Sequence, residues 1–270
     1  MRILHFSDIH FGKPPHGLAW MFDKRLLGTM TQFLRRRHRQ DMAAVERLVA
    51  LAEQLQPDCV ICTGDLTAVS APAEFEEAVR RLKPLRESVK GRFVYLPGNH
   101  DAYVRDGASR EELKHTLAEL NGLESADESL PVECLVGNVH LLFVDGACPQ
   151  LPWRSGGRLA EGSFERLRHC LEAERKEGER RVLVSHFPLY GPDGGRLGWR
   201  RGIEGDLELR SLCERGLADV LLCGHIHHPF RWKKNGFAQY CAGSVTLSRS
   251  AVLLDIADDS PSIEGRFLEL

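Results

Sequence analysis

The sequence predicts an α/β protein, and two observations lead to this fold class. Short runs of strand-forming residues alternate along the chain with longer stretches in which apolar residues recur every three or four positions. The helical stretches become shorter toward the C-terminus, which favours a second sheet of mixed strand directions. No linker-like stretch separates two halves, so we expect a single domain over residues 1–270.

The expected strands are short runs rich in apolar and β-branched residues. Polar or turn-forming residues bound these runs, as is typical of strands buried in a sheet. They lie at residues 2–6, 58–63, 93–96, 139–144, 181–185, 219–223, 237–241 and 252–256, and Phe267 and Leu268 indicate one more.

Helices are expected between these strands. Asp41 is a suitable N-cap for the first of them. Pro84 predicts an interruption or a bend in the second, and Ser109 with Glu112 forms a capping-box pattern that opens the third. The expected helices are the one after Asp41, with its apolar face between residues 45 and 55, and those at residues 72–89, 109–120, 163–178 and 206–216.

Composition limits the class of protein. A chain of 270 residues can bury a large core without disulfides. Its formal net charge of −2 gives no overall attraction to nucleic acid, so we expect no nucleic-acid partner. The chain lacks the apolar run of about 18 residues that a transmembrane helix needs, and its N-terminus lacks the apolar core of a signal peptide. The eight scattered cysteines suit a reducing, cytoplasmic setting.

Two of these cysteines, Cys59 and Cys62, have the spacing of half a zinc site. They lie in an expected strand, where residues three apart point to opposite faces of the sheet. No second pair with this spacing follows in the sequence. We therefore interpret both as small core residues.

Polar residues of one chemical kind follow several of the expected strands. In α/β sheets, ligands bind beyond the carboxyl ends of the strands, so side chains at these positions can converge. The sequence "YLPGNHD" illustrates the pattern, because a strand stops at a Pro-Gly turn and an amide, an imidazole and a carboxylate follow at once. A simple turn is the alternative interpretation. The residues at strand ends are Asp8, His10, Asp65, Asn99, His100, Asp101, His186, His225 and His227.

Carboxylate, amide and imidazole groups are ligands for hard to borderline metal ions. Asp8 and His10 are two residues apart, as are His225 and His227, and in extended backbone such pairs point to the same side. The set is too large for one ion. A bridging carboxylate such as Asp65 suits two ions about 3.5–4 Å apart.

The ordered set "DIH…GD…GNHD…H…GHIH" resembles the calcineurin-like metallophosphoesterases, and the resemblance runs from Asp8 to about Ser244. It implies a four-layer α/β/β/α sandwich of two mixed sheets flanked by helices, with a dinuclear metal site at the strand ends. By position, it assigns Asp8, His10, Asp65 and His227 to one metal. It assigns Asp65, Asn99, His186 and His225 to the other.

The resemblance also implies the reaction. A metal-bridging hydroxide attacks phosphorus in line and breaks a phosphodiester or phosphoanhydride bond. His100 stabilises or protonates the leaving oxygen, and Asp101 orients its imidazole. Mixed oxygen and nitrogen ligands admit Mn²⁺, Fe or Zn²⁺, and we expect Mn²⁺. Some proteins with this fold are non-catalytic scaffolds that have lost metal ligands, but here every ligand position is filled.

The substrate is less well indicated. The compact length and the blocks around Asn99 and His225 resemble the small phosphodiesterase branch. The "SHFP" block at His186 departs from the cyclic-nucleotide phosphodiesterases, which stay an alternative. Cations and an aromatic residue near the metal blocks are candidate substrate contacts, with a solvated basic loop as the alternative. They are Lys13, His16, Arg196, Trp199, Arg200 and Arg201.

The segment from Leu18 to Arg39 suggests a second function. Six cations and one acid give it a charge of +5, and Phe22, Leu26, Met30 and Phe33 fall on one face of a helix. This pattern is typical of an interfacial membrane helix, although a helix packed on the fold is an equal alternative. Contact with an anionic membrane would place the protein peripherally at its inner face. It would also favour a UDP-diacylglucosamine-type lipid pyrophosphatase, from the same superfamily.

Overall fold

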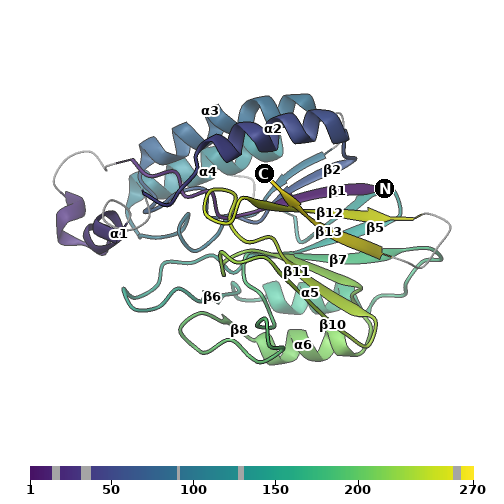
Figure 1. Cartoon of the computed structure of the whole chain (residues 1–270). Helices are drawn as coiled ribbons and strands as arrows, with labels where there is room; N and C mark the ends of the chain where they lie inside the picture. The colour runs from purple at the N-terminus through teal and green to yellow at the C-terminus, as the bar shows by residue number, and fades with distance from the viewer. Residues whose placement is uncertain (14–18, 32–37, 90–91, 127–130, 258–262) are drawn as a thin grey trace.

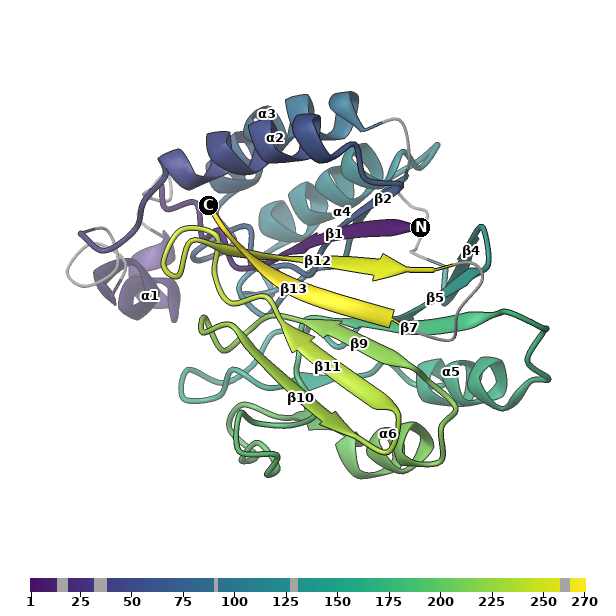
Figure 2. The same cartoon turned by 45° about the vertical axis from the view of Figure 1, so that its right-hand side comes forward.

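The computed structural model describes residues 1–13, 19–31, 38–89, 92–126, 131–257 and 263–270. Within these ranges the chain forms two sheets packed face to face, with helices on the outer face of each (Figures 1 and 2). The predicted α/β/β/α sandwich is therefore confirmed. No helix among these residues is both long and apolar enough to cross a bilayer.

The first sheet has the strand order β13-β12-β1-β2-β3. Its strands β1, β2 and β3 run parallel, and β12 and β13 are added antiparallel at the other edge. The bounds are β1 Arg2–Phe6, β2 Cys59–Cys62, β3 Arg92–Tyr95, β12 Ser250–Ile256 and β13 Ile263–Glu269. The strand indicated by Phe267 and Leu268 is thus β13.

The second sheet has the order β10-β11-β9-β7-β5-β4, with parallel strands in the middle and antiparallel strands at both edges. The edge strands β4 and β10 were not predicted, because their mixed polar sequences ECLV and FRWKK lack a continuous apolar run. The bounds are β4 Glu133–Val136, β5 Val139–Val144, β7 Arg180–Ser185, β9 Val220–Cys223, β10 Phe230–Lys234 and β11 Phe237–Cys241.

A short pair of parallel strands, β6 (Gly157–Arg158) and β8 (Ile203–Glu204), lies outside the two main sheets. It joins two loops that follow β5 and β7 in the chain. This pair is also absent from the sequence prediction, because two-residue strands carry no detectable periodicity.

The helices of the two outer layers are α2 (Ala43–Leu55), α3 (Pro72–Ser88) and α4 (Gly107–Asn121) on the first sheet, and α5 (Ser163–Glu172) and α6 (Asp206–Glu214) on the second (Figure 2). The N-cap of α2 is Met42 rather than the predicted Asp41, although Asp41 Oδ1 accepts the N–H of Ala43, the first helical residue. The helix α3 continues through Pro84, so the predicted interruption does not occur.

Two predicted helix boundaries are wrong. The third helix begins before Ser109, because Asp106 is its N-cap and accepts bonds from Ser109 N and Oγ. The fourth helix, α5, ends near residue 172 rather than 178. Its last carbonyls are bound by the buried Arg181, which donates to Leu171 O and Ala173 O and so replaces another turn of helix.

Three apolar layers hold the sandwich together, one between the sheets and one under each set of helices. Cys59 packs into the layer between the sheets, and Cys62 into the layer under α2–α4. Both are buried free thiols on opposite faces of β2, as predicted for core residues. All eight cysteines of the chain are free.

The basic segment forms two short helical pieces in its described part, η1 (Ala19–Phe22) and α1 (Arg25–Thr31), rather than one helix. Arg25 is buried and pairs with Asp23 and Asp106. A Cβ on Gly28 would lie 2.6 Å from Val69 Cγ1, so the glycine allows α1 to pack closely on the fold. The described residues do not include 14–18 and 32–37. His16, Phe33 and most arginines of the basic segment lie in these two ranges.

We expect a buried ion pair to make the free energy of unfolding of the protein depend on pH. Glu179 Oε1 lies 2.7 Å from Arg181 Nε, with both side chains almost fully buried. Burial by itself would raise the pKa of Glu179, but hydrogen bonds from Arg181 and the Lys176 amide outweigh it and lower the pKa to about 2. Because this lies below the unfolded value, the carboxylate stabilises the fold above about pH 4.5 by roughly 2–3 kcal/mol, and this is lost toward pH 2.

Urea unfolding of the wild type and Glu179→Gln, both in chelator, tests this expectation. The difference in unfolding free energy should be largest at pH 7 and should shrink toward pH 3. A difference that is the same at both pH values would contradict it.

Candidate metal centre

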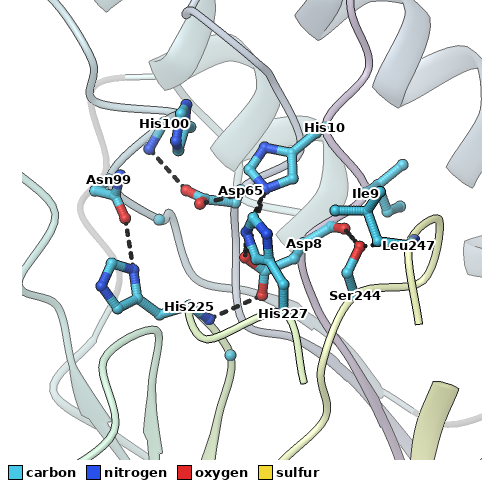
Figure 3. A network of polar contacts seen from close by, with 12 residues as sticks. Asp8, Ile9, His10, Asp65, Asn99, His100, His225, His227, Ser244 and Leu247 are labelled. Carbon is cyan, nitrogen blue, oxygen red and sulfur yellow. Dashed lines mark hydrogen bonds and ion pairs between the residues drawn. The ribbon is translucent and has the colours of Figure 1, made fainter. Parts of the chain in front are cut away.

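The predicted metal ligands lie together at the carboxyl ends of five strands, three from the first sheet and two from the second (Figure 3). Backbone pairing of the loops continues the ladder between β1 and β2, since Asp8 N donates to Gly64 O and His10 N to Asp65 O. The strands and the side chains that follow them are β1 with Asp8 and His10, β2 with Asp65, β3 with Asn99, β7 with His186, and β9 with His225 and His227.

The first donor cluster consists of Asp8, His10, Asp65 and His227. One potential ligand atom from each of these residues lies within 4.8 Å of the others. Asp8 Oδ1 is 3.0 Å from His227 Nε2 and 3.6 Å from His10 Nε2, and the two Nε2 atoms are 2.9 Å apart.

The second donor cluster consists of Asp65, Asn99, His186 and His225. Asn99 Oδ1 is its centre, 3.1 Å from His186 Nε2 and 2.9 Å from His225 Nδ1. The family resemblance implied the same grouping of residues. The structure adds that His225 turns Nδ1 toward the cluster, whereas His186 turns Nε2.

Asp65 belongs to both clusters through one oxygen. Its Oδ2 lies 3.7 Å from His10 Nε2 and 3.4 Å from His186 Nε2. Its Oδ1 instead accepts the backbone N–H of His100 at 2.7 Å. The carboxylate is therefore held with one oxygen facing both donor clusters, which is the arrangement of a bridging ligand.

The hydrogen bonds of the two central imidazoles fit metal binding. His10 Nδ1 lies 3.1 Å from Thr67 O, and His186 Nδ1 lies 2.7 Å from Thr63 O. Because a carbonyl only accepts, each Nδ1 carries a proton, and in a neutral ring Nε2 presents a lone pair to the other donors. Asp8 Oδ1 is buried and has no hydrogen-bond donor among the described residues. Lone pairs gathered in this way fit divalent cations.

The charges of this centre are strongly linked. Burial would raise the pKa of Asp65, but the neighbouring His186 and His100 hold it well below its usual range. Burial would lower the pKa of His186, yet the Asp65 carboxylate outweighs it and raises the pKa to about 9. Burial and the charge of His186 lower the pKa of His225 to about 3.

The backbone at the ligands is unusual. Asp8, His10, Asp65, His225 and His227 all have φ between 55° and 72°, in the left-handed region that non-glycine residues seldom adopt. Such residues are commonly held at functional sites by their surroundings. Here Ser244 Oγ donates to Asp8 O (Figure 3). Thr246 Oγ1 donates to Ile9 O, between the two ligands that follow β1.

Gly98 gives a test of how closely this centre is packed. A Cβ at this position would lie 2.3 Å from Asp65 Oδ1 and 2.8 Å from His186 Cε1. Gly98→Ala should therefore displace Asp65 and weaken metal binding by about 10–100-fold, as changes in groups that hold ligands do. Gly107→Ala is the matched control, because its Cβ would meet nothing within 4 Å. Metal titration of both variants decides the matter, and equal affinities would be incompatible with the expectation.

His100 lies beside the metal ligands, and its ring contacts that of His10 edge-on with centroids 4.8 Å apart. Its Nδ1 bonds to Ala68 O, so the expectation that Asp101 orients this imidazole is wrong. The Asp101 carboxylate accepts bonds from Thr67 and from Gly98 N. By these bonds the carboxylate holds the turn that carries the ligands. Adjacent side chains in this turn point to different sides, so Asp101 does not face the imidazole of His100.

Sequence reasoning missed a stack of side chains beside His100. The Tyr103 ring lies parallel to the imidazole at 5.2 Å, with an interplanar angle of 7°. On this tyrosine the Lys24 ammonium lies 3.8 Å from the ring centroid. No pattern in the sequence indicates the stack, because Lys24 comes from a loop far from residue 103 in the chain.

Two connected cavities open at this centre. The metal pocket, of about 200 Å³, is lined by Asp65, Asn99, His100, Ser155, Arg201, His225, Ile226 and His227. The outer cavity, of about 490 Å³, shares some of these residues. Its lining consists of Lys24, Asn99, His100, Tyr103, Gln150, Pro152, Trp153, Arg154, Ser155, Arg200 and Arg201.

Some of the candidate substrate contacts line these cavities and others do not. Arg200 and Arg201 line these cavities. Arg196 instead forms a bidentate pair with Asp206, and Lys13 pairs with Glu77, so the structure does not bring either to the cavities. Trp199 is exposed and does not line them, and His16 lies outside the described residues.

Known proteins match both the sequence and the fold. The chain is 26% identical to a component of the nuclease SbcCD from Staphylococcus epidermidis, over 93% of its own length and 63% of that protein. It is also 26% identical to a cAMP/cGMP dual specificity phosphodiesterase from Mycobacterium tuberculosis, over 69% of its own length and 49% of that protein. The chain thus spans about half to two thirds of these relatives.

A third relative, the glycerophosphodiester phosphodiesterase GpdQ from Enterobacter lignolyticus, is 26% identical over 84% of this chain and 71% of that protein. Among solved structures, a dimetal phosphatase from Danio rerio has the same fold. It matches with a TM-score of 0.64 and 13% identity over 99% of this chain and 98% of that chain. The calcineurin-like phosphoesterase family matches residues 1–229, and the chain therefore belongs to this family of dinuclear metal-dependent phosphoesterases.

Proposed function

We propose that the protein hydrolyses phosphodiesters at a centre that holds two divalent metal ions. The observation that carries the proposal is the position of Asp65 Oδ2, which faces both donor clusters. Asp65 would bridge the ions, whose remaining ligands would be Asp8, His10 and His227 on one side and Asn99, His186 and His225 on the other.

The relatives support a diester substrate. The names of two of them specify phosphodiesterase activity, on cyclic nucleotides and on glycerophosphodiesters, and a third is part of a nuclease. These substrates share a phosphate esterified on both sides. They share neither a base nor a sugar, so the proposal is limited to the phosphodiester.

The chain's own groups have separate tasks around the phosphate. Ions in the centre would supply activated water and positive charge for the phosphoryl oxygens. His100, held through Nδ1 by Ala68 O, would in its imidazolium form give the Nε2 proton to the leaving oxygen and become neutral. Arg201 lines the metal pocket and would stabilise charge that develops on the phosphoryl group.

We further propose Mn²⁺ as the native metal. Two carboxylates, one amide and four imidazoles, with no thiolate, form a donor set of mixed oxygen and nitrogen ligands that is compatible with Mn²⁺, iron and zinc alike, so metal exchange is the test of this proposal. The cytoplasmic setting expected from the cysteines stays a prediction of the sequence.

The test is hydrolysis of bis-p-nitrophenyl phosphate, p-nitrophenyl phosphate and cyclic AMP before and after metal exchange. We expect diester hydrolysis to exceed monoester hydrolysis, to disappear after dialysis against chelator, and to return best with Mn²⁺ when compared with Fe²⁺ and Zn²⁺. Full diesterase activity in metal-free protein would refute the dinuclear proposal.

Peripheral contact with an anionic membrane is a second proposal, favoured by the surface of η1 and α1. Four apolar side chains there are exposed, Phe22 to 90%, Leu27 to 59%, Met30 to 50% and Met21 to 45%. Exposed apolar residues next to cations are typical of interfacial segments. Hydrolysis of a lipid-linked pyrophosphate has less support, because the matched relatives are a nuclease component and phosphodiesterases.

Sedimentation with anionic liposomes at about 0.1 M salt tests membrane contact. We expect the wild type to pellet, and Phe22→Ser with Met30→Ser to reduce the bound fraction at least about tenfold, because two buried side chains contribute several kcal/mol. Leu207→Ser is the control, since Leu207 is equally exposed but lies on α6 in the opposite outer layer. Equal pelleting of all three proteins would exclude a role for the α1 surface.

A further inference from the structure

The outer cavity has a rigid wall built from two loops. Gly157 N donates to Gly202 O at 3.2 Å, and Ser155 N donates to Arg200 O at 2.8 Å. Arg200 Nε in turn donates to Trp153 O at 3.0 Å. Together with the β6–β8 pair, these bonds fix the position of Arg200 and of its neighbour Arg201 beside the metal pocket.

Most nearby cations are neutralised by acids. Arg154 and Arg158 both pair with Glu204, and Arg196 pairs with Asp206. Arg25 is likewise paired with Asp23 and Asp106.

Three cations of the outer cavity differ from these. In the described part of the chain, no carboxylate lies within ion-pair distance of Lys24, Arg200 or Arg201. All three line this one cavity. Lys24 is partly buried, whereas Arg200 and Arg201 are exposed at the rim of the cavity. Together they give the cavity a positive potential that no acid among the described residues cancels, which favours an anionic ligand.

Lys24 is the partly buried one of these three cations. Its ammonium donates to Gln150 O at 3.0 Å and lies over the Tyr103 ring, two neutral partners. Burial lowers its pKa to about 8, and the charge of the neighbouring Asp23 offsets only part of this effect. An anion in the outer cavity would stabilise its charged form.

We propose that the outer cavity binds a second phosphate group, carried by the leaving group of the substrate. The inference rests on the proposed diesterase function and specifies its substrate class. His100, the proposed proton donor to the leaving oxygen, lines both cavities, so the outer cavity lies on the leaving-group side. Arg201 lies at the junction of the two cavities, whereas Lys24 and Arg200 line the outer cavity and not the metal pocket.

Dinucleotides give a matched test. Thymidylyl-thymidine is compared with the same molecule phosphorylated at its free 5′ end or its free 3′ end, and the products identify which nucleoside leaves. We expect kcat/KM to be at least about tenfold higher when the extra phosphate is on the leaving nucleoside, as for one charge-assisted contact worth about 1.5 kcal/mol. The isomer with its phosphate on the other nucleoside should show no such gain.

Variants of the cavity residues test whether the outer cavity causes the increase in kcat/KM. Lys24→Gln combined with Arg200→Gln should bring the ratio of the two kcat/KM values close to one. Arg215→Gln is the control and should keep the ratio, because Arg215 pairs with Glu172 and does not line this cavity.

Glycerophosphoinositol and its 4-phosphate form a second substrate pair. A gain in both pairs supports recognition of phosphate alone, and a gain only in the dinucleotides supports recognition of a phosphorylated nucleoside.

A binding measurement separates this inference from the proposed function. Calorimetry on metal-loaded protein should give at least about tenfold tighter binding of thymidine 3′,5′-bisphosphate than of thymidine 5′-monophosphate, with the difference lost in the double variant. If bis-p-nitrophenyl phosphate is hydrolysed but neither the ratio nor the binding difference appears, the second subsite is refuted and the diesterase function stands. If no diester is hydrolysed, the function fails, and the binding difference alone decides the subsite.

Discussion

Asp65→Asn should lower kcat/KM for a phosphodiester by about 10³-fold or more and should reduce the bound metal from two ions to one or none. The substitution keeps the size of the side chain but removes the anionic oxygen that faces both donor clusters. Metal ions contribute several kcal/mol of transition-state stabilisation, and about 4 kcal/mol corresponds to this factor. Among the described residues, no other carboxylate lies within ion-pair distance of both His10 and His186.

Metal content and steady-state kinetics on the same preparation provide the measurement. Asp255→Asn is a suitable control, because Asp255 is an exposed carboxylate paired with Arg266 on β12. Circular dichroism verifies that both variants are folded. An Asp65→Asn protein that keeps two ions and normal activity would show that Asp65 does not bridge.

His100→Ala should lower kcat by about 10²–10⁴-fold for a diester with an alcohol leaving group, while both ions stay bound. The reason is geometric. His100 lies beside the ligands and lines both cavities, but its Nδ1 is used by Ala68 O and its ring is stacked on Tyr103. Its loss removes a proton donor without removing a ligand.

The leaving group distinguishes this role from a structural one. p-Nitrophenolate leaves readily without a proton, so His100→Ala should reduce hydrolysis of bis-p-nitrophenyl phosphate much less than that of a dinucleotide. His115→Ala, an exposed histidine on α4, should leave both rates unchanged. If His100→Ala loses metal, the residue is a ligand and the assignment as acid is incorrect.

The metal centre was predictable because its ligands occupy positions that the fold class itself defines. Each follows a buried strand, and the carboxyl ends of parallel strands meet at one edge. The local geometry was not predictable from the same pattern. Asp101 follows His100 directly, yet its carboxylate turns toward Thr67 and Gly98 because the turn separates neighbouring side chains.

The substrate cavity was less predictable, because the availability of a cation depends on distant partners. Arg196 and Arg201 belong to the same basic stretch and look equivalent in the sequence. Asp206 neutralises the first, whereas the second lines the metal pocket. Lys24 reaches the cavity only because α1 packs through Gly28 against Val69 and Tyr103. Such contacts follow from packing, which periodicity does not encode.

The position of β1 has a consequence for how the protein is made. This strand leaves the ribosome before the other strands of the fold, yet it lies in the middle of its sheet, between β2 and β12, and pairs with residues 252–255. Its ligands are also held by Ser244 and Thr246. Strand β1 can pair early with β2, alongside β3 and α2–α4, but its other edge waits for a partner about 250 residues later. A growing polypeptide therefore leaves one edge of β1 unpaired, and the carbonyls of Asp8 and Ile9 without the hydroxyls of Ser244 and Thr246, until the C-terminal part of the chain has been made.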